Sequence, residues 1–324
     1  MREILRWLSG ALSDKSITPG MGSYCVQGGE IRATDGRVTA GHPWDGEGEF
    51  LVPGSELEKI LARLPGEPTL EVLEQSIRIK SGRFRGEVQT LALENWAYPG
   101  PEGMNWQELP DDLMDVLKAL RPFISDNAIQ PWAMTCALIG GWAMATDNVC
   151  LAGAPFHAGG KVQELLVPIW AIDFLLGHDE APTEWAWNDV AIAFRWPNGA
   201  WMRSAVIVGK FPETAAAMVR AAWELEPPHA FSPAFREAFE RISALSDGLI
   251  TLYADRMTGS FSQAQVEEEI EVPLPTDCEA THWGGKFLAN VLSAATVWDP
   301  TSWPRPSPWA GPVLAGYIVG SRKG

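Results

Sequence analysis

The feature that most constrains this chain of 324 residues is an internal repeat with a period of about 112 to 115 residues. The tripeptide A-T-D at 33–35 returns at 145–147, each time after an apolar run that ends at a turn. The run FLVP at 50–53 returns as LLVP at 165–168, and each predicts a strand that enters a helix through proline. A repeat of this length decides the architecture before any local pattern does.

The last third of the chain follows the same order, with helix-like FSPAFREAFERISALS, strand-like GLITLYADRM and EEEIEVPL, and helix-like GGKFLANVLSAA. We read TLALENWAYP, ending at Pro99, and AVIVGKFP, ending at Pro212, as the strands that close the first two copies. We therefore predict three domains of about 108 residues, at 1–104, 105–220 and 221–324. Each has two helices on antiparallel sheets, which makes the predicted fold class α+β and excludes a doubly wound parallel sheet.

Local patterns support this plan. Apolar residues at 4, 5, 8 and 12, and again at 113, 116, 117 and 120, are spaced for helices, whereas 76–80 alternates as a strand does. The glycines at 28–29, 140–141 and 199 predict hairpin turns. Asp35 and Asp147 lie in T-D-G and T-D-N, where a carboxylate is expected to cap a turn rather than to act in catalysis.

Composition excludes several classes of protein. With 46% apolar and 20% charged residues the chain is expected to fold, and no run of 18 apolar residues predicts a membrane span. The N-terminus has no signal-peptide pattern, so we expect a soluble, cytoplasmic protein without a membrane partner. The four cysteines are scattered, which predicts neither disulfides nor a zinc site.

The sequence contains no constellation typical of an enzyme. It lacks G-x-S-x-G, H-E-x-x-H and P-loop motifs, and its five histidines are far apart and expected in loops or at the surface. We therefore predict no catalytic residue, no metal site and no cofactor.

The 16 tryptophans leave an alternative open. Trp185 and Trp187 would lie on one face of a strand, where exposed indoles could bind carbohydrate or another flat ligand. Against this interpretation, Trp7, Trp142, Trp170 and Trp298 lie in apolar runs or helical stripes and are expected to pack.

Positive charge is scarce, since 25 basic residues face 41 acidic ones and the net charge is −16. Such a protein avoids nonspecific adhesion to nucleic acid, yet basic residues recur on the predicted helices of each copy. They are Arg2, Arg6, Lys118, Arg121, Arg236 and Arg241 on the first helices, and Lys59, Arg63 and Lys286 on the second. Arg6, Arg121 and Arg236 are 115 residues apart, so equivalent helices would present cations to phosphates without reading sequence. The alternative is a solvated face, with pairs such as Arg236 and Glu240.

Four landmarks occur in one order: M-A-T-D at 144–147, V-P at 167–168, G-K-F-P at 209–212 and Y-I-V at 317–319. In these motifs, and in its three copies, the chain resembles the β sliding clamp of bacterial DNA polymerase III. The resemblance implies a DNA-clamp fold and a homodimeric, head-to-tail ring of six domains that threads duplex DNA and serves as a processivity factor. The basic residues above would then face the DNA.

The resemblance also implies a hydrophobic pocket between the second and third domains for peptides of a replicative DNA polymerase and a clamp loader. The matching positions are Thr146, Asn148, Leu151, Pro212, Ala217, Tyr317, Ile318 and Val319. The chain departs from the family with A-T-D-N-V-C-L in place of A-T-D-G-H-R-L and with the ending G-S-R-K-G in place of M-P-M-R. A divergent or phage-encoded member, or a clamp-like structural protein that no longer binds a polymerase, therefore stays open.

Overall fold

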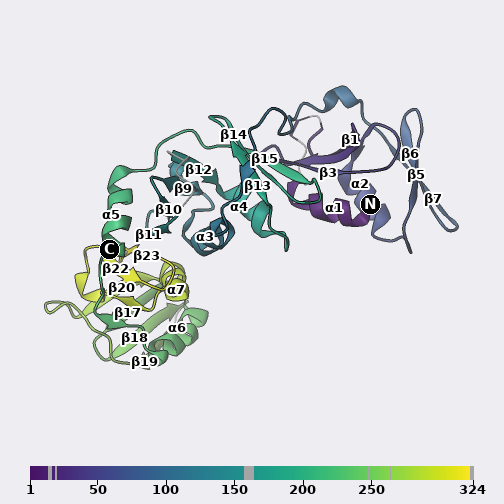
Figure 1. Ribbon diagram of the computed structural model, residues 1–324. Helices are drawn as coiled ribbons and strands as arrows, with labels where there is room; N and C mark the ends of the chain where they lie inside the picture. Colours follow the sequence, from purple (N-terminus) through teal and green to yellow (C-terminus); the bar gives the residue numbers. More distant parts are fainter. Residues whose placement is uncertain (14–16, 19, 157–163, 247, 263, 322–324) are drawn as a thin grey trace. The chain divides into compact units, whose positions relative to one another are not determined.

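The computed structural model describes residues 1–13, 17–18, 20–156, 164–246, 248–262 and 264–321 (Figure 1). The chain divides into two compact units. One combines Met1–Asp111 with Trp170–Val208, and the other combines Asp112–Ile169 with Gly209–Gly324.

Within the described residues, one order of elements occurs three times: a helix, four strands, a second helix and three closing strands. The first copy comprises α1 (Arg2–Leu8), β1 (Ser23–Gln27), β2 (Glu30–Thr34), β3 (Val38–Pro43), β4 (Phe50–Pro53), α2 (Gly54–Leu61), β5 (Thr69–Val72), β6 (Ser76–Ser81) and β7 (Phe84–Gln89). The second comprises α3 (Leu113–Leu120), β9 (Thr135–Ile139), β10 (Trp142–Thr146), β11 (Cys150–Pro155), β12 (Glu164–Pro168), α4 (Ile169–Leu176), β13 (Glu184–Trp187), β14 (Ala191–Arg195) and β15 (Trp201–Ala205).

The third copy comprises α6 (Pro233–Leu245), β17 (Leu249–Tyr253), β18 (Arg256–Phe261), β19 (Ala264–Glu269), β20 (Ala280–Gly284), α7 (Gly285–Ala294), β21 (Val297–Trp298), β22 (Ser307–Ala310) and β23 (Ala315–Ile318). Outside this order are β8 (Gln107–Glu108), α5 (Glu213–Trp223) and β16 (His229–Ala230). Short 3-10 turns lie at Ser9–Ala11, Leu93–Asn95, Arg121–Phe123, Pro131–Met134 and Pro300–Ser302. The predicted α+β class and the threefold plan are confirmed.

Backbone pairing joins one copy to the next. In the first unit an eight-stranded sheet runs β4-β1-β2-β3-β15-β14-β13-β8, so the third strand of the first copy pairs with the last strand of the second. In the other unit the order β12-β9-β10-β11-β23-β22-β21-β16 repeats this joint between the second and third copies. All these pairs are antiparallel, and Val38 opposes Ser204 where Cys150 opposes Ile318. Smaller sheets run β5-β6-β7 and β19-β18-β17-β20.

The two A-T-D turns repeat each other bond for bond. The hydroxyl of Thr34 donates to the carbonyl of Val38 at 2.8 Å, and that of Thr146 donates to Cys150 at 2.6 Å. The carboxylate oxygen of Asp35 accepts from two backbone N–H groups, and so does that of Asp147. The predicted capping role of both aspartates is confirmed.

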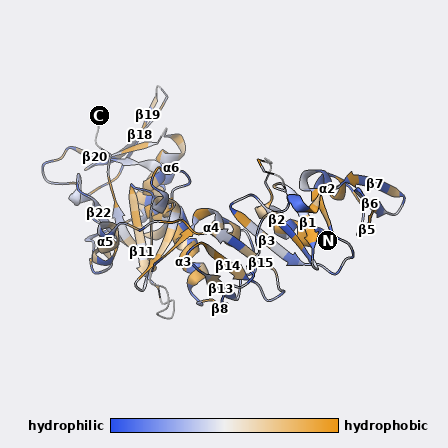
Figure 2. Ribbon diagram, turned by 90° about the horizontal axis from the view of Figure 1, so that it is seen from above, coloured by the Kyte–Doolittle hydropathy of each residue, from blue (hydrophilic) through white to orange (hydrophobic). Residues whose placement is uncertain are grey.

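The core follows from the alternation along the strands. The predicted stripe at 113, 116, 117 and 120 is buried, and β6 buries Ile77 and Ile79. In the first helix Leu5 and Leu8 are buried, whereas Ile4 is half-buried and Leu12 lies beyond the helix. Hydrophobic residues run along central strands such as β11 (Figure 2). The predicted hairpin turns are also confirmed, because Gly28 and Gly140 have positive φ angles of 63° and 55° that favour glycine.

Three strand predictions were wrong in extent. The segment 90–99 contains a single bridge, Leu51 to Leu91, and then a 3-10 turn, whereas 206–212 follows the end of β15. In the third copy β19 ends at Glu269, before most of EEEIEVPL. The predicted boundary after residue 220 falls inside α5, and the division into three domains at 1–104, 105–220 and 221–324 stays a prediction.

Candidate functional site

Arg2 and Arg236, predicted to face DNA, bind backbone carbonyls at or shortly after the end of the second helix of their own copy. Arg2 donates to the carbonyl of Leu64 at 2.5 Å, just beyond the end of α2. Arg236 donates to the carbonyls of Leu292 and Ala295 at 2.5 and 2.6 Å, at the end of α7. Because a cation at a helix C-terminus satisfies unpaired carbonyls, these guanidinium groups stabilise the fold.

This shared role changes which basic residues of the first and third copies are equivalent. Arg236 corresponds to Arg2, since Leu5 and Leu8 follow Arg2 at the same intervals as Phe239 and Ile242 follow Arg236, and all four are buried. The expected equivalence of Arg236 with Arg6 was therefore wrong. The alternative pair of Arg236 with Glu240 is not formed either, since the Arg236 guanidinium binds backbone carbonyls.

Two further basic residues are engaged in ion pairs. Arg121 lies 2.8 Å from Asp126, and Arg241 lies 2.5 Å from Glu268. The carboxylate of Glu268 holds the pKa of Arg241 above its usual value, chiefly through their hydrogen bond. Of the residues predicted to face DNA, Arg6, Lys59, Arg63, Lys118 and Lys286 are exposed and form no ion pair within 4.0 Å among the described residues.

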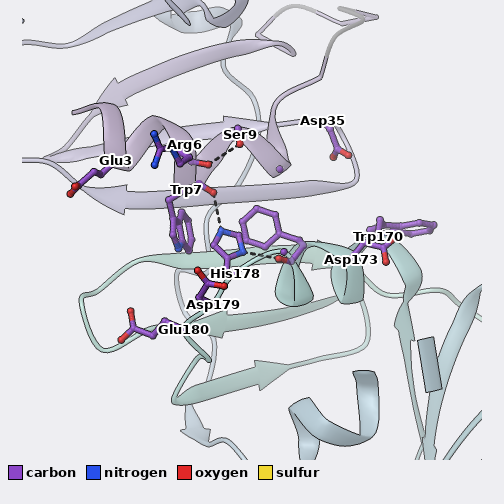
Figure 3. A pocket seen from close by; sticks show the side chains of 13 residues that line it. Glu3, Arg6, Trp7, Ser9, Asp35, Trp170, Asp173, His178, Asp179 and Glu180 are labelled. Atoms are coloured by element: carbon purple, nitrogen blue, oxygen red, sulfur yellow. Dashed lines mark hydrogen bonds between the residues drawn. The ribbon is translucent and has the colours of Figure 1, made fainter. Parts of the chain in front are cut away.

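The surroundings of Arg6 are acidic rather than basic. Arg6 lines a pocket of about 690 Å³ between α1 and α4 (Figure 3). Its carboxylate side chains are Glu3, Asp35, Asp173, Asp179 and Glu180, and Arg6 is the only lysine or arginine among its lining residues. A phosphate group approaching this pocket is repelled, so Lys59 and Arg63 are better placed than Arg6 to meet phosphates among the predicted residues of the first copy.

An aromatic cluster forms the inner wall of this pocket. The ring of Trp7 lies 4.7 Å from His178, 5.5 Å from Phe174 and 5.0 Å from Trp196. The two ring nitrogens of His178 lie 2.7 Å from the Phe174 carbonyl and 2.9 Å from the Trp7 carbonyl. The expectation that each histidine lies in a loop or at the surface was wrong for His282, which lies in β20 and is 7% exposed, whereas His178 lies in the loop that follows α4. His157 lies outside the described residues.

The predicted peptide-binding residues of the second copy gather around the β10–β11 turn and β23. Leu151 pairs with Tyr317 across β11 and β23, and the backbone N–H of Val319 donates to the Val149 carbonyl at 2.9 Å. Asn148 supplies the turn with a left-handed residue (φ 74°), and its N–H donates to the hydroxyl of Thr146. One surface of the sheet thus carries most of these positions.

Helix α5 packs on this surface. Pro212 precedes its first turn, and a Cβ on Gly153 would meet the Val219 side chain at 2.5 Å, so glycine permits the close approach of helix and strand. Of the predicted pocket residues, Val319 is 41% exposed and Ala217 is exposed, so a peptide could reach both. Ile318 is fully buried, which corrects its predicted place in the pocket lining to a supporting place in the core.

Burial also changes the titration of two groups in this region. It raises the pKa of Asp147, although the N–H donors of Cys150 and Val149 and the charge of Lys286 partly offset it. It raises the pKa of the Tyr317 phenol as well. Both side chains are therefore partly removed from water, as expected beside an apolar contact surface.

The structure also bears on the ligand platform suggested by the tryptophans, on metal ligands and on membrane spans. Trp185 is 2% exposed and packs against Trp187 at 4.5 Å between ring centroids, so the pair is no open platform for a flat ligand. In the described part of the chain, no three or more His, Cys, Asp or Glu side chains come together as metal ligands would. None of the helices described has the length and apolar character needed to cross a bilayer.

Comparison with solved structures identifies the architecture. The Pseudomonas aeruginosa DNA polymerase III subunit beta matches with a TM-score of 0.76 at 19% identity, over 99% of this chain and 97% of that one. The C. crescentus beta sliding clamp matches with a TM-score of 0.77 at 18% identity, over 99% and 96%. The chain has the fold of the bacterial sliding clamps.

The match extends to a sliding clamp with a bound peptide. The Helicobacter pylori beta clamp bound to a DNA ligase peptide has a TM-score of 0.75 at 16% identity, over 99% of this chain and 97% of that one. No family model and no curated protein matches this chain by sequence. The sliding-clamp fold is thus retained here at an identity too low for sequence comparison.

Sequence reasoning missed the capping arginines and the bridging histidine. A signal for the first was present, because Arg-Glu at 2–3 returns at 236–237 with apolar residues at the same later positions. No local signal marked the second, since the Trp7 carbonyl is 171 residues away from His178 in the chain.

Proposed function

We propose that this protein is a DNA sliding clamp, a non-enzymatic processivity factor that encircles duplex DNA and tethers a replicative DNA polymerase. The observation that carries the proposal is the agreement of nearly the whole chain with clamp structures, all three copies included. A chain of three copies with this fold has the parts for half of a six-domain ring, and closure then requires a second copy of the chain.

The strands that close the ring follow from the joints inside the chain. In both internal joints the third strand of one copy pairs antiparallel with the last strand of the next, as β3 with β15 and β11 with β23. The third copy has β19 in this place at the edge of its sheet, and the first copy has β7 at the edge of its own. We assign β19 and β7 of a second copy as partners, which would cover both edges.

The charges on these edges are complementary. Exposed Arg83 and Arg85 lie at the beginning of β7, and exposed Glu267 and Glu269 lie toward the end of β19. In an antiparallel pair these two ends meet. Apolar surface is available on both sides, since Phe84 is 40% and Phe261 is 50% exposed.

A charge exchange tests the ring. The chain has a mass of 35.4 kDa, so a closed dimer should have about 71 kDa by light scattering. Arg83→Glu with Arg85→Glu should give monomers, and adding Glu267→Arg with Glu269→Arg to the same chain should restore the dimer. Lys210→Glu, an exposed change outside both edges, is the matched control. A wild-type chain that stays monomeric at every concentration would overturn the assignment.

DNA would be held topologically, with phosphate contacts from Lys59, Arg63, Lys118 and Lys286. A dimer loaded on nicked circular DNA should stay bound at high salt and leave when the circle is cut. If the dimer dissociates from nicked circular DNA and from the cut, linear DNA at the same rate, encirclement is contradicted.

Partner recognition would use the surface around the β10–β11 turn, β23 and the start of α5. Its exposed Val319 and Ala217 beside partly buried Tyr317 suit an extended peptide with an apolar anchor, the kind of segment by which a polymerase or a clamp loader could bind. The clamp from H. pylori was solved with a DNA ligase peptide, which supports a peptide-binding role for this fold.

A further inference from the structure

His178 connects the ends of two helices that belong to different copies (Figure 3). Its Nδ1 lies 2.7 Å from the carbonyl oxygen of Phe174 in the last turn of α4. Its Nε2 lies 2.9 Å from the carbonyl oxygen of Trp7 in the last turn of α1. Both partners are carbonyl oxygens, which only accept hydrogen bonds. A neutral imidazole has one N–H and can satisfy one of them, whereas an imidazolium has two and satisfies both.

The C-terminal ends of α1 and α4 both present the negative end of a helix dipole. The ring centroids of Trp7 and Phe174 lie 4.7 and 4.6 Å from that of the imidazole, in tilted arrangements, at distances where aromatic rings attract cations.

Charged groups surround the His178 imidazole on each of the elements that pack against it. Glu3 and Arg6 lie on α1, Asp35 in the β2–β3 turn, Asp173 on α4, and Asp179 and Glu180 after it. Five carboxylates thus face one guanidinium. His42, from β3, lies against the same Trp7 at 5.7 Å, and its Nδ1 is 2.8 Å from the carbonyl of Pro43 beside it in the chain.

We propose that His178 is a protonation-dependent latch that ties the first copy to the second. As an imidazolium it holds the ends of α1 and α4 together by two hydrogen bonds. When the imidazolium loses a proton, one of these two hydrogen bonds is lost. The neutral ring stays packed in the aromatic cluster. The contact between the two helices is then firm while the ring is protonated and weaker once the ring is neutral. The latch needs neither a ring nor DNA.

The first test is NMR of the full chain with ¹⁵N-labelled histidine, with the His178 signals assigned through a His178→Gln variant. Both ring nitrogens of His178 should carry a proton at pH 5.5. One of these two protons should be lost when the pH is raised to 8. A ring that keeps one charge state over this whole interval overturns the proposal, whether that state is neutral or protonated.

The second test measures how the stability of the protein depends on the protonation of His178. Glutamine can donate to a carbonyl but does not titrate, so the gap in melting temperature between wild type and His178→Gln should narrow as the pH rises from 5.5 to 8. The loss of one hydrogen bond corresponds to a narrowing of about 3 °C. The matched control is His42→Gln, for which the gap should stay constant. A constant gap for His178→Gln would contradict the latch. If that variant does not fold, resonance assignment through neighbouring backbone signals of the wild type still decides the charge state.

Discussion

Arg2 and Arg236 have similar roles in the first and third copies, because Arg2 donates to the Leu64 carbonyl shortly after α2 and Arg236 donates to the Leu292 and Ala295 carbonyls at the end of α7. Met114 stands at the corresponding position of the second copy, three residues before buried Leu117. The basic residues of the first helices therefore separate into structural arginines and exposed cations. This separation makes the two roles testable by different measurements.

Replacing Arg236 with methionine should lower the free energy of unfolding by about 2 kcal/mol, because two charge-assisted bonds to carbonyls are lost while the apolar stem is kept. Urea denaturation measures the change. The matched control is Arg241→Met, whose solvent-exposed pairs with Glu268 and Glu237 should contribute much less to the free energy of unfolding. Equal losses in the two variants would contradict a structural role for Arg236.

Reversing the charge of Lys59 and Arg63 together should weaken direct binding to duplex DNA and leave the free energy of unfolding unchanged. Each phosphate contact that is lost lowers the slope of log affinity against log salt by about 0.9. The measurement is a fluorescence titration of a labelled duplex at several salt concentrations. A slope equal to that of the wild type, or of a Lys210→Glu control, would show that these side chains do not meet phosphates.

Val319→Asp and Ala217→Asp should each reduce the stimulation of a replicative polymerase about tenfold, since a charge placed on the apolar surface opposes an apolar anchor. Both side chains are exposed, so the melting temperature should not change. Truncation after Gly316 is a poorer experiment, because it removes the fully buried Ile318 and the end of β23. Stimulation that survives both aspartates would exclude this surface as the peptide site.

Asp147→Asn should change the pH dependence of stability. Burial raises the pKa of Asp147, so the folded chain holds this proton more tightly than the unfolded chain does. The resulting stability is present in acid and is lost as the pH rises through the raised pKa. Asparagine can still accept from the turn N–H groups but carries no charge. The variant should therefore gain stability relative to wild type between pH 4 and pH 7, measured by urea denaturation, and a constant difference would contradict this.

The parts of the fold that depend on neighbouring residues could be predicted from the sequence. Leu5 and Leu8 mark a helix by their spacing, and the Thr34-Asp35 turn closes through hydrogen bonds between residues two to four positions apart. The strand ends at 90–99 and 206–212 could not be placed in this way, because apolar residues there continue after the pairing partners have ended.

The site was harder to predict than the fold. The position of a cation on a helix is visible in the sequence, but its partner is a backbone carbonyl that only folding brings near, as Leu64 is for Arg2. Likewise, Ile318 and Val319 are adjacent and both apolar, and the register of β23 with β11 and β22 decides which one is buried. The acidic pocket beside Arg6 combines carboxylates from four segments of the chain. No single stretch of sequence therefore predicts it.

The joints between the copies are made of main-chain hydrogen bonds between β3 and β15 and between β11 and β23. Such bonds use atoms that every residue other than proline carries, so substitution of the side chains along these strands leaves the bonds themselves in place. Evolution could therefore replace most of the residues on both sides of a joint without separating the copies. This tolerance explains how a chain that matches no family model by sequence can keep its architecture from end to end.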